Sequence, residues 1–161
     1  MPNKQILDAC CASRAFGFDS ENPIVLYNDI RNGEYADQDG RITFVSPKTN
    51  YDFRNLPFKD SSFYHVVFDP PHLSYKGRNN THIKCMYGEL TENWREDLQK
   101  GLSECYRVLK KHGTLIFKWS EHDISINTIM REVVTPSGLT PLYGHRTMTK
   151  QTTIWMCFYK N

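Results

Sequence analysis

Apolar residues recur along the chain in short continuous runs, each closed by polar or turn-forming residues. Runs of this length and with these boundaries are typical of β-strands. Their apolarity is continuous rather than alternating, which indicates strands covered on both faces, as in a parallel sheet. We expect four such strands, at residues 5–11, 24–30, 64–68 and 114–119.

One long helix is predicted between the third and fourth runs. Its apolar residues repeat at steps of three and four and so lie on one stripe of a helix. They are Trp94, Leu98, Leu102, Cys105 and Leu109. The cations at 110–112 suit a helix C-terminus, and Gly113 is expected to stop the helix. A second, shorter helical period covers 124–133 and is expected to end before Pro136.

The end of the chain predicts two more strands, 142–148 and 153–159, joined by a polar tip at 149–152. Strands joined by so short a connection must be antiparallel. We therefore predict an α/β fold, a Rossmann-like open sandwich with a mostly parallel seven-stranded sheet and an antiparallel C-terminal hairpin. The stretch 13–22 leaves room for a short helix at most. The stretch 29–52 has no clear helical period, so a helix there is expected to be absent or replaced by irregular chain.

Composition limits the organisation of the chain. A length of 161 residues with 39% apolar residues supplies one core, so we expect a single domain over 1–161. The formal net charge of +2 argues against a protein that coats phosphate backbones, and any contact with nucleic acid must be local. The five cysteines follow no metal-ligand spacing, so we expect reduced thiols and no metal site. Because neither a secretory segment nor a membrane span is evident, we predict a cytoplasmic protein with no membrane partner.

Acidic and small residues follow the first two predicted strands. In an open α/β sheet, ligands bind at the carboxyl ends of the strands. The first strand leads into Asp8 and the small residues up to Ser13, and the second ends in Asp29, 21 residues after Asp8. An acid at about this spacing is placed to accept the two hydroxyls of a nucleoside ribose. The alternative for Asp29 is a plain turn-forming role.

A third acid, Asp52, lies in the segment 51–58 before the next predicted strand. Its carboxylate could accept a hydrogen bond from an adenine amino group while Phe53 covers the ring. The alternative is a surface loop. These residues extend the candidate nucleoside site to a third strand connection.

The sequence Asp69-Pro70-Pro71-His72 comes directly after the third strand. Its two prolines fix φ and remove two backbone donors, which holds the Pro70 carbonyl outward beside the Asp69 carboxylate. Such a pair of acceptors can take both hydrogens of an amino group and aim its lone pair at an electrophilic methyl group. His72 offers a flat face to a base. In isolation the same motif is only a turn signal.

Together these motifs resemble the class I S-adenosylmethionine-dependent methyltransferases, in particular the amino-methyltransferases with a [D/N/S]-P-P-[Y/F/W/H] motif and, among them, small phage-associated DNA methyltransferases. The resemblance covers nearly the whole chain. It includes residues 107–116, which are similar to the family's junction between a helix and the fifth strand. It implies S-adenosylmethionine as cofactor and methyl transfer to an exocyclic amino nitrogen, adenine N6 or cytosine N4 of DNA. The implied catalytic residues are Asp69, Pro70, Pro71 and His72. The implied cofactor contacts are Asp8, Ala9, Cys10, Cys11, Ala12, Ser13, Asp29, Ile30, Asp52, Phe53 and Asp69.

The chain departs from the family pattern in its first loop and at the last residue of the motif. Cys10, Ala12 and Arg14 stand where the family has glycines. His72 replaces the commoner Tyr or Phe, so the target base is open. The stretch 76–84 follows the motif where a substrate would enter, and a solvated loop is its alternative role. Its basic residues are candidate phosphate contacts: Lys76, Arg78, His82 and Lys84.

Two other functions stay open at this point. A planar amide presents the same geometry as a base amino group, so the substrate could be RNA or a protein glutamine. The altered first loop also fits a cofactor-binding subunit that has lost catalysis. We expect no separate target-recognition domain in a chain of this length, so sequence specificity would come from loops or from a protein partner.

Overall fold

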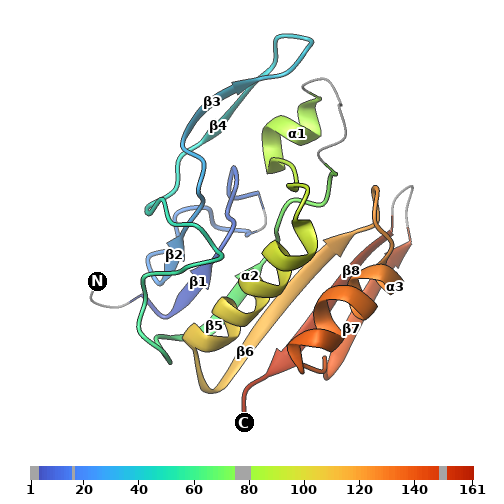
Figure 1. Ribbon diagram of the computed structural model, residues 1–161. Coiled ribbons are helices and arrows are strands. Elements are labelled where there is room, and N and C mark those ends of the chain that lie inside the picture. Colours follow the sequence, from blue (N-terminus) through green and yellow to red (C-terminus); the bar gives the residue numbers. More distant parts are fainter. Residues whose placement is uncertain (1–3, 16, 75–80, 149–151) are drawn as a thin grey trace.

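The main sheet of the protein has six strands. In the computed structural model, which describes residues 4–15, 17–74, 81–148 and 152–161, they follow the order β2–β1–β5–β6–β8–β7 (Figure 1). The first four in this order pair in parallel, whereas β8 pairs antiparallel with both β6 and β7. The strands are β1 (Ile6–Asp8), β2 (Val25–Tyr27), β5 (Phe63–Phe68), β6 (Leu109–Ser120), β7 (Tyr143–Met148) and β8 (Thr152–Tyr159). This confirms the predicted α/β fold and its antiparallel C-terminal hairpin.

The predicted count of seven strands is wrong for the described part of the sheet. The segment after β2 instead forms a separate antiparallel ribbon of β3 (Gly33–Ala36) and β4 (Ile42–Val45). Ile42 and Phe44 are exposed, whereas Thr43 and Val45 are buried. This alternation suits a ribbon that is covered on one side, and not a strand inside a parallel sheet. The expected absence of a helix in this stretch is confirmed.

Three helices lie in the described residues, α1 (His82–Tyr87), α2 (Trp94–Val108) and α3 (Ile126–Ile129). Helix α2 confirms the predicted long helix, but its predicted end is wrong, because the chain becomes extended at Leu109 and β6 begins there. Gly113 therefore lies inside a strand and stops no helix. A Cβ at Gly113 would lie 2.7 Å from the Tyr64 carbonyl oxygen, so glycine allows the close approach of two strands.

Helix α3 continues into further helical turns, Met130–Val134 and Thr135–Ser137. The second predicted helix is thus confirmed in place, but it runs past its expected end at Pro136. Pro136 lies in the first turn of the last segment, where its missing N–H needs no partner. Gly138, with φ 74°, then ends the helical turns.

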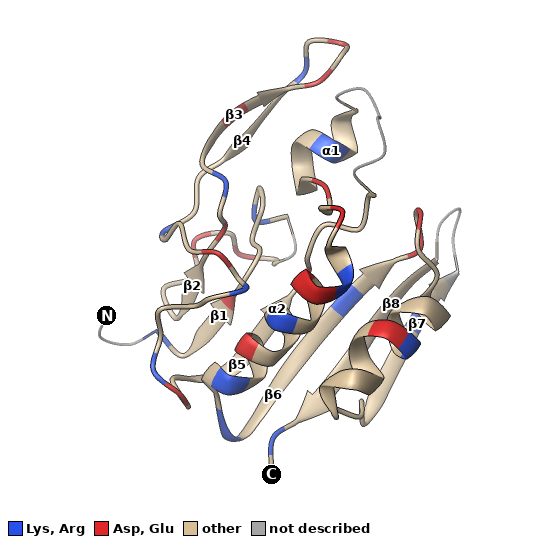
Figure 2. Ribbon diagram, in the orientation of Figure 1, with Lys and Arg blue, Asp and Glu red and all other residues tan. Residues whose placement is uncertain are grey.

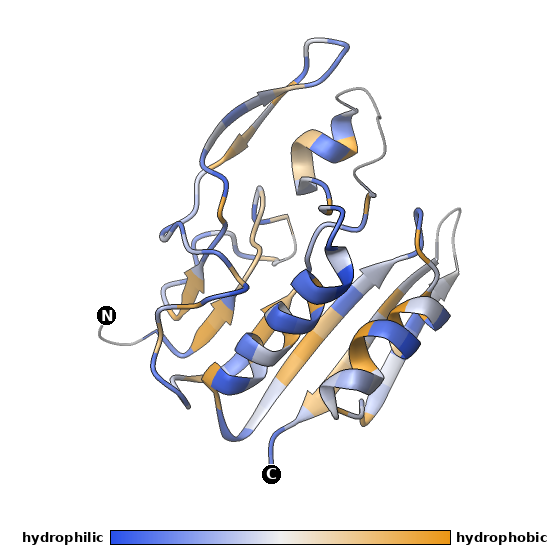
Figure 3. Cartoon of the chain, in the orientation of Figure 1, coloured by the Kyte–Doolittle hydropathy of each residue, from blue (hydrophilic) through white to orange (hydrophobic). Residues whose placement is uncertain are grey.

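Helices α2 and α3 lie over the same face of the main sheet (Figure 1). Figure 3 shows apolar residues concentrated in the strands of this sheet and hydrophilic ones on the outward side of α2. Large side chains from both layers are fully buried together, among them Phe68, Leu98, Leu102, Phe117 and Phe158. This core fixes the strands whose ends carry the candidate site.

The connection from β1 to β2 contains turns and no helix in its described residues. This agrees with the limited room predicted for 13–22. None of the described helices has both the length and the apolarity that crossing a membrane requires. Figure 2 shows acidic and basic residues interspersed along the ribbon, as a small net charge leads one to expect.

Candidate functional site

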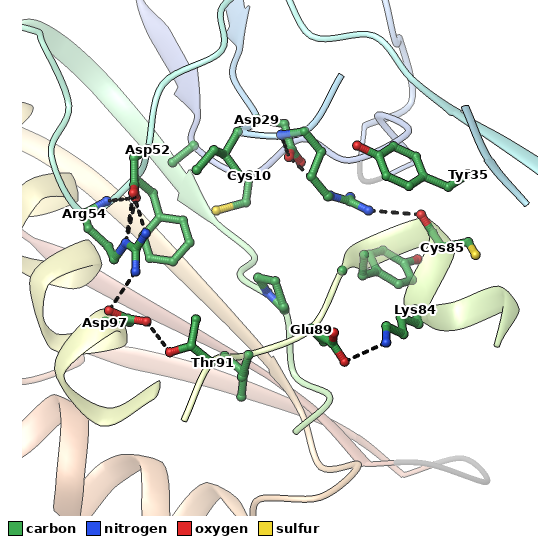
Figure 4. Close-up of a pocket in the computed structure, with 18 of the residues that line it drawn as sticks. Cys10, Asp29, Tyr35, Asp52, Arg54, Lys84, Cys85, Glu89, Thr91 and Asp97 are labelled. Atoms are coloured by element: carbon green, nitrogen blue, oxygen red, sulfur yellow. Dashed lines mark hydrogen bonds and ion pairs between the residues drawn. The ribbon is translucent and has the colours of Figure 1, made fainter. Parts of the chain in front are cut away.

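A cavity of about 670 Å³ opens at the carboxyl ends of β1, β2 and β5 (Figure 4). Small-molecule sites in proteins occupy roughly 300–1,000 Å³. One wall consists of strand ends and the loops that follow them, and it includes Ala9, Asp29 and Pro71. The opposite wall is formed by what we call the arm, which comprises β3, β4 and α1 packed against one another. The arm projects beyond the end of the main sheet (Figure 1). Ligands of open α/β sheets bind at this edge.

The loop after β1 follows a path that normally requires glycine. Ala12 and Arg14 have φ values of 48° and 59°, a left-handed conformation that costs a non-glycine residue roughly 1–2 kcal/mol. Arg14 anchors the loop, because its guanidinium bonds to the Ser46 carbonyl and lies 4.8 Å from the ring centre of Tyr27. Two residues other than glycine therefore hold left-handed positions in this loop.

Asp29 follows β2 and holds this loop against the cavity. Its Oδ2 accepts a hydrogen bond from the Ala12 N–H (2.9 Å), and its Oδ1 accepts one from the Arg31 N–H (2.8 Å). A carboxylate offers about four acceptor positions, two on each oxygen. By this count each oxygen of Asp29 can accept one more hydrogen bond, with Arg31 Nε 3.4 Å from Oδ1, and the residue lines the cavity. Two adjacent hydroxyls, as on a ribose, match this arrangement.

Asp52 lines the same cavity and is held by Arg54. The Arg54 Nε lies 2.9 and 3.0 Å from the two carboxylate oxygens, and Nη2 lies 2.6 Å from Oδ2. Arg54 also donates to Asp97, which accepts a further hydrogen bond from the Thr91 hydroxyl. The hydrogen bonds from Arg54 lower the pKa of Asp52, which stays ionised. Asp52 is therefore a fixed acceptor at one end of the cavity.

Phe53 supplies an apolar wall beside Asp52. Its ring meets the buried Phe68 ring edge to face, with centroids 5.3 Å apart. Gly101 of α2 makes room for both rings, because a Cβ there would lie 2.5 Å from Phe53 Cδ2 and 2.7 Å from Phe68 Cζ. The position of Phe53 against the cavity thus depends on a glycine in α2.

The proline motif reaches the cavity at Pro71, whereas Asp69 lies outside its lining. The Asp69 carboxylate is buried, and its Oδ2 accepts a hydrogen bond from Lys118 Nζ at 2.6 Å. Its Oδ1 is buried without a hydrogen-bond partner among the described atoms. Burial raises the pKa of Asp69. The motif thus keeps an unpaired acceptor next to a lysine.

His72 does not present the open ring face that the sequence analysis predicted for stacking on a base. The ring is 4% exposed and stacks on His122, with centroids 5.3 Å apart and an interplanar angle of 3°. The centroid of the Tyr87 ring lies 5.6 Å from that of His72. Nδ1 lies 3.3 Å from the Pro70 carbonyl oxygen, and it is the donor in this hydrogen bond because a carbonyl oxygen can only accept one. Burial lowers the pKa of His72 to about 4, so the ring is neutral near pH 7. In this conformation His72 offers no open face on which a base could stack.

The remaining predicted cofactor contacts divide into two groups. Ala9, Cys10 and the half-exposed Ile30 line the cavity. Burial raises the pKa of the Cys10 thiol well above its usual value, so Cys10 is a thiol and not a thiolate. The others lie outside the lining: Asp8, Cys11, Ala12 and Ser13. Asp8 is buried at the end of β1, with one carboxylate oxygen unpaired among the described atoms.

The predicted phosphate contacts are only partly described. Lys84 lines the cavity and pairs with Glu89 at 2.9 Å. His82 is exposed, and its Nδ1 lies 3.6 Å from the Asp37 carboxylate. Both belong to α1, and not to a loop. Lys76 and Arg78 lie outside the described residues.

Three basic residues of the site were missed by sequence reasoning: Arg31, Arg54 and Lys118. Lys118 could have been recognised from the sequence, because a lysine inside an apolar strand run needs a partner for its charge. Arg54 stood two residues after a predicted site acid. Arg31 gave no signal, since its partners in α1 lie 54 and 55 residues away in the sequence.

Solved structures of S-adenosylmethionine-dependent methyltransferases share the fold of this chain. A crystal structure of the PH0226 protein from Pyrococcus horikoshii superposes with a TM-score of 0.60 at 14% identity, covering 98% of this chain and 82% of that chain. An S-adenosylmethionine-dependent methyltransferase from Methanosarcina mazei gives 0.56 at 11% identity, covering 99% and 93%.

The [4+2]-cyclase SpnF has the same fold, with a TM-score of 0.55 at 10% identity, covering 98% of this chain and 75% of that chain. At such identities the likeness shows the fold alone, and the cyclase illustrates that one fold carries different chemistries. No protein-family model and no curated protein matches the chain. The residues of the site therefore carry the functional assignment.

Proposed function

We propose that the protein is an S-adenosylmethionine-dependent methyltransferase that methylates an exocyclic amino nitrogen. The observation that carries the proposal is the Asp29 carboxylate, which lines the cavity after β2 and keeps an acceptor position on each oxygen. A nucleoside ribose provides two adjacent hydroxyl donors for these positions. Asp52 and Phe53 extend the same cavity with an acceptor and an apolar wall for the adenine ring.

The charge of the cavity also favours this cofactor. Its lining contains five acidic and three basic side chains. An excess of negative charge attracts a cationic ligand, and the sulfonium of S-adenosylmethionine is a cation. The acids are Asp29, Glu34, Asp52, Glu89 and Asp97, and the bases are Arg31, Arg54 and Lys84. When bound, the cofactor supplies an electrophilic methyl group.

The chain's own part in the transfer is to orient the amine. We assign Asp69 Oδ1, which is buried and unpaired among the described atoms, as acceptor for one amino hydrogen. The Pro70 carbonyl accepts the other. Lys118 holds the second oxygen of Asp69 and so fixes the direction of the carboxylate. The rate enhancement comes from positioning and electrostatic alignment, with no covalent intermediate. Asp69 or water takes the proton after transfer.

We propose DNA as the substrate, at adenine N6 or cytosine N4. Lys84 lies on the arm side of the cavity, where it can meet a phosphate that follows an inserted base. Extruding a paired base costs a few kcal/mol, so single-stranded or mismatched DNA is the favoured form. RNA, a protein glutamine and a non-catalytic cofactor-binding subunit are the competing outcomes. A protein partner would supply sequence recognition.

Transfer of a tritiated methyl group to separate pools of duplex DNA, single-stranded DNA, RNA and protein tests this proposal. We expect label in a DNA pool, and a loss of about 100-fold or more with Asp69→Asn, which keeps the shape but weakens the acceptor. Asp60→Asn, which changes an exposed acid, is the control. Label confined to RNA or protein would reassign the substrate. Cofactor binding without label in any pool would favour the non-catalytic subunit.

A further inference from the structure

Arg31 joins the two walls of the cavity. Its Nη1 and Nη2 donate to the carbonyl oxygens of Cys85 and Met86, at 3.0 and 2.8 Å, in the last turns of α1. At the other end of the side chain, Nε lies 3.4 Å from Asp29 Oδ1. One guanidinium thus spans the distance from the proposed ribose acceptor to the helix of the arm; Figure 4 labels the two ends of this span, Asp29 and Cys85.

The arm depends on such contacts for its position. An isolated two-stranded ribbon is marginally stable at best, and a helix of six residues is too short to persist alone in water. Arg31 braces both parts, because its guanidinium carbon also lies 5.3 Å from the ring centre of Tyr35 in β3. A cation at carbonyls that end a helix is favourable. Loss of Arg31 therefore removes these links between the arm wall and the wall formed by the strand ends.

We infer that Arg31 is a positioning residue that couples nucleoside binding at Asp29 to the placement of α1. This inference rests on the function proposed above. A ribose hydroxyl that donates to Asp29 fixes the orientation of that carboxylate, and the neighbouring Arg31 is then held in the geometry that caps α1. Cofactor binding consequently orders the arm wall, from which Lys84 and Tyr87 line the cavity.

Hydrogen exchange on the intact protein, with and without S-adenosylmethionine, tests the coupling. The readout is amide protection in residues 82–88, measured in the wild type, in Arg31→Met and in Arg31→Lys. The lysine variant keeps a charge beside Asp29 but cannot reach two carbonyls as a guanidinium fork does. The control is Arg41→Met, which removes an exposed arginine of the arm that pairs with Asp37 and Asp39.

We expect the cofactor to raise protection of residues 82–88 in the wild type and in Arg41→Met. In both Arg31 variants this gain should disappear at saturating cofactor. Because coupling is reciprocal, the cofactor affinity measured by calorimetry should fall with it, by roughly fivefold or more. If Arg31 only stabilised α1, its loss would lower protection in both states and leave the gain unchanged. That result would overturn the coupling and leave the proposed function standing. So would a wild type that binds the cofactor without a gain in amide protection of residues 82–88. Absence of cofactor binding in the wild type would overturn the proposed function and the coupling with it.

Discussion

Four carboxylates of the candidate site differ in their hydrogen-bond partners, and these partners determine the role proposed for each: Asp8, Asp29, Asp52 and Asp69. Asp29 is bound by two backbone N–H groups, Asp52 by Arg54 and Asp69 by Lys118. Asp8 is buried with one oxygen unpaired among the described atoms. The sequence predicted Asp8, Asp29 and Asp69 as site residues from their places at the ends of apolar runs. It predicted Asp52 from the segment that precedes the next run. Their partners could not be predicted, because each depends on how distant segments meet.

Replacement of Asp29 by Asn tests its role as ribose acceptor. The amide nitrogen cannot accept, so one charge-assisted hydrogen bond of about 1.5–3 kcal/mol is lost. We expect the dissociation constant for S-adenosylmethionine to rise by roughly 10- to 100-fold, as measured by calorimetry. Asp39→Asn, which removes an exposed acid of the β3–β4 turn, should bind as the wild type does. Equal affinity of Asp29→Asn and the wild type would remove Asp29 from the site.

The stability of the protein should depend on Asp8 in a particular pH window. Burial and the neighbouring Asp69 raise the pKa of Asp8 from 3.8 to about 7. Between these values the folded state binds a proton that the unfolded state does not, so the free energy of unfolding falls as pH rises through the window. Asp8→Asn cannot ionise and should therefore stabilise the protein more at pH 8 than at pH 5.

Urea unfolding of the wild type and Asp8→Asn at these two pH values measures this difference. The lowered pKa of His72 acts in the opposite direction, because the unfolded state binds the proton as pH falls. His72 is present in both proteins, so its effect cancels in the comparison as long as its own environment is unchanged. An identical stability difference at both pH values would show that Asp8 is ionised throughout.

The elements around the cavity differ in how far the sequence predicted them. Helix α2 had a strong apolar period and was confirmed, except for its end. The C-terminal hairpin was predicted from two strand-like runs and a short polar tip, and it was confirmed. The ribbon of β3 and β4 was missed, because its strands have four residues each and only one covered side. Helix α1 was missed because its six residues carry a single buried side chain, Cys85. One wall of the candidate site therefore comes from elements too short to have a periodic signal.

Gly101 links the core packing of α2 to the cavity. In Gly101→Ala the new methyl group would overlap the rings of Phe53 and Phe68. Because Phe68 is fully buried, Phe53 is the ring that can move, toward the cavity. We expect destabilisation of about 1–3 kcal/mol and a weaker binding of S-adenosylmethionine.

Thermal unfolding and calorimetric titration of the same sample check both expectations. Lys100→Ala is a matched control, because it changes the neighbouring but exposed position of α2. If Gly101→Ala lost stability and kept full cofactor affinity, Phe53 would have no part in the site.

At the scale of the whole molecule, the sequence was sufficient for the α/β fold and for the edge of the sheet at which the site lies. Continuous apolar runs predicted the parallel strands, and strand order then brought Asp29, Asp52 and Pro71 to one cavity. The sequence could not predict that the arm would close the other side, since contacts such as those between Arg31 and α1 join residues far apart in the chain.

Calorimetric titration of the wild-type protein with S-adenosylmethionine, and separately with its demethylated product, tests the central claim most directly. The account predicts saturable one-to-one binding of both compounds, because both present the same ribose and adenine. It predicts that Asp29→Asn weakens both to a similar extent, as Asp29 contacts the part that they share. Binding of neither compound to the folded wild type would contradict the assignment of this cavity to the cofactor.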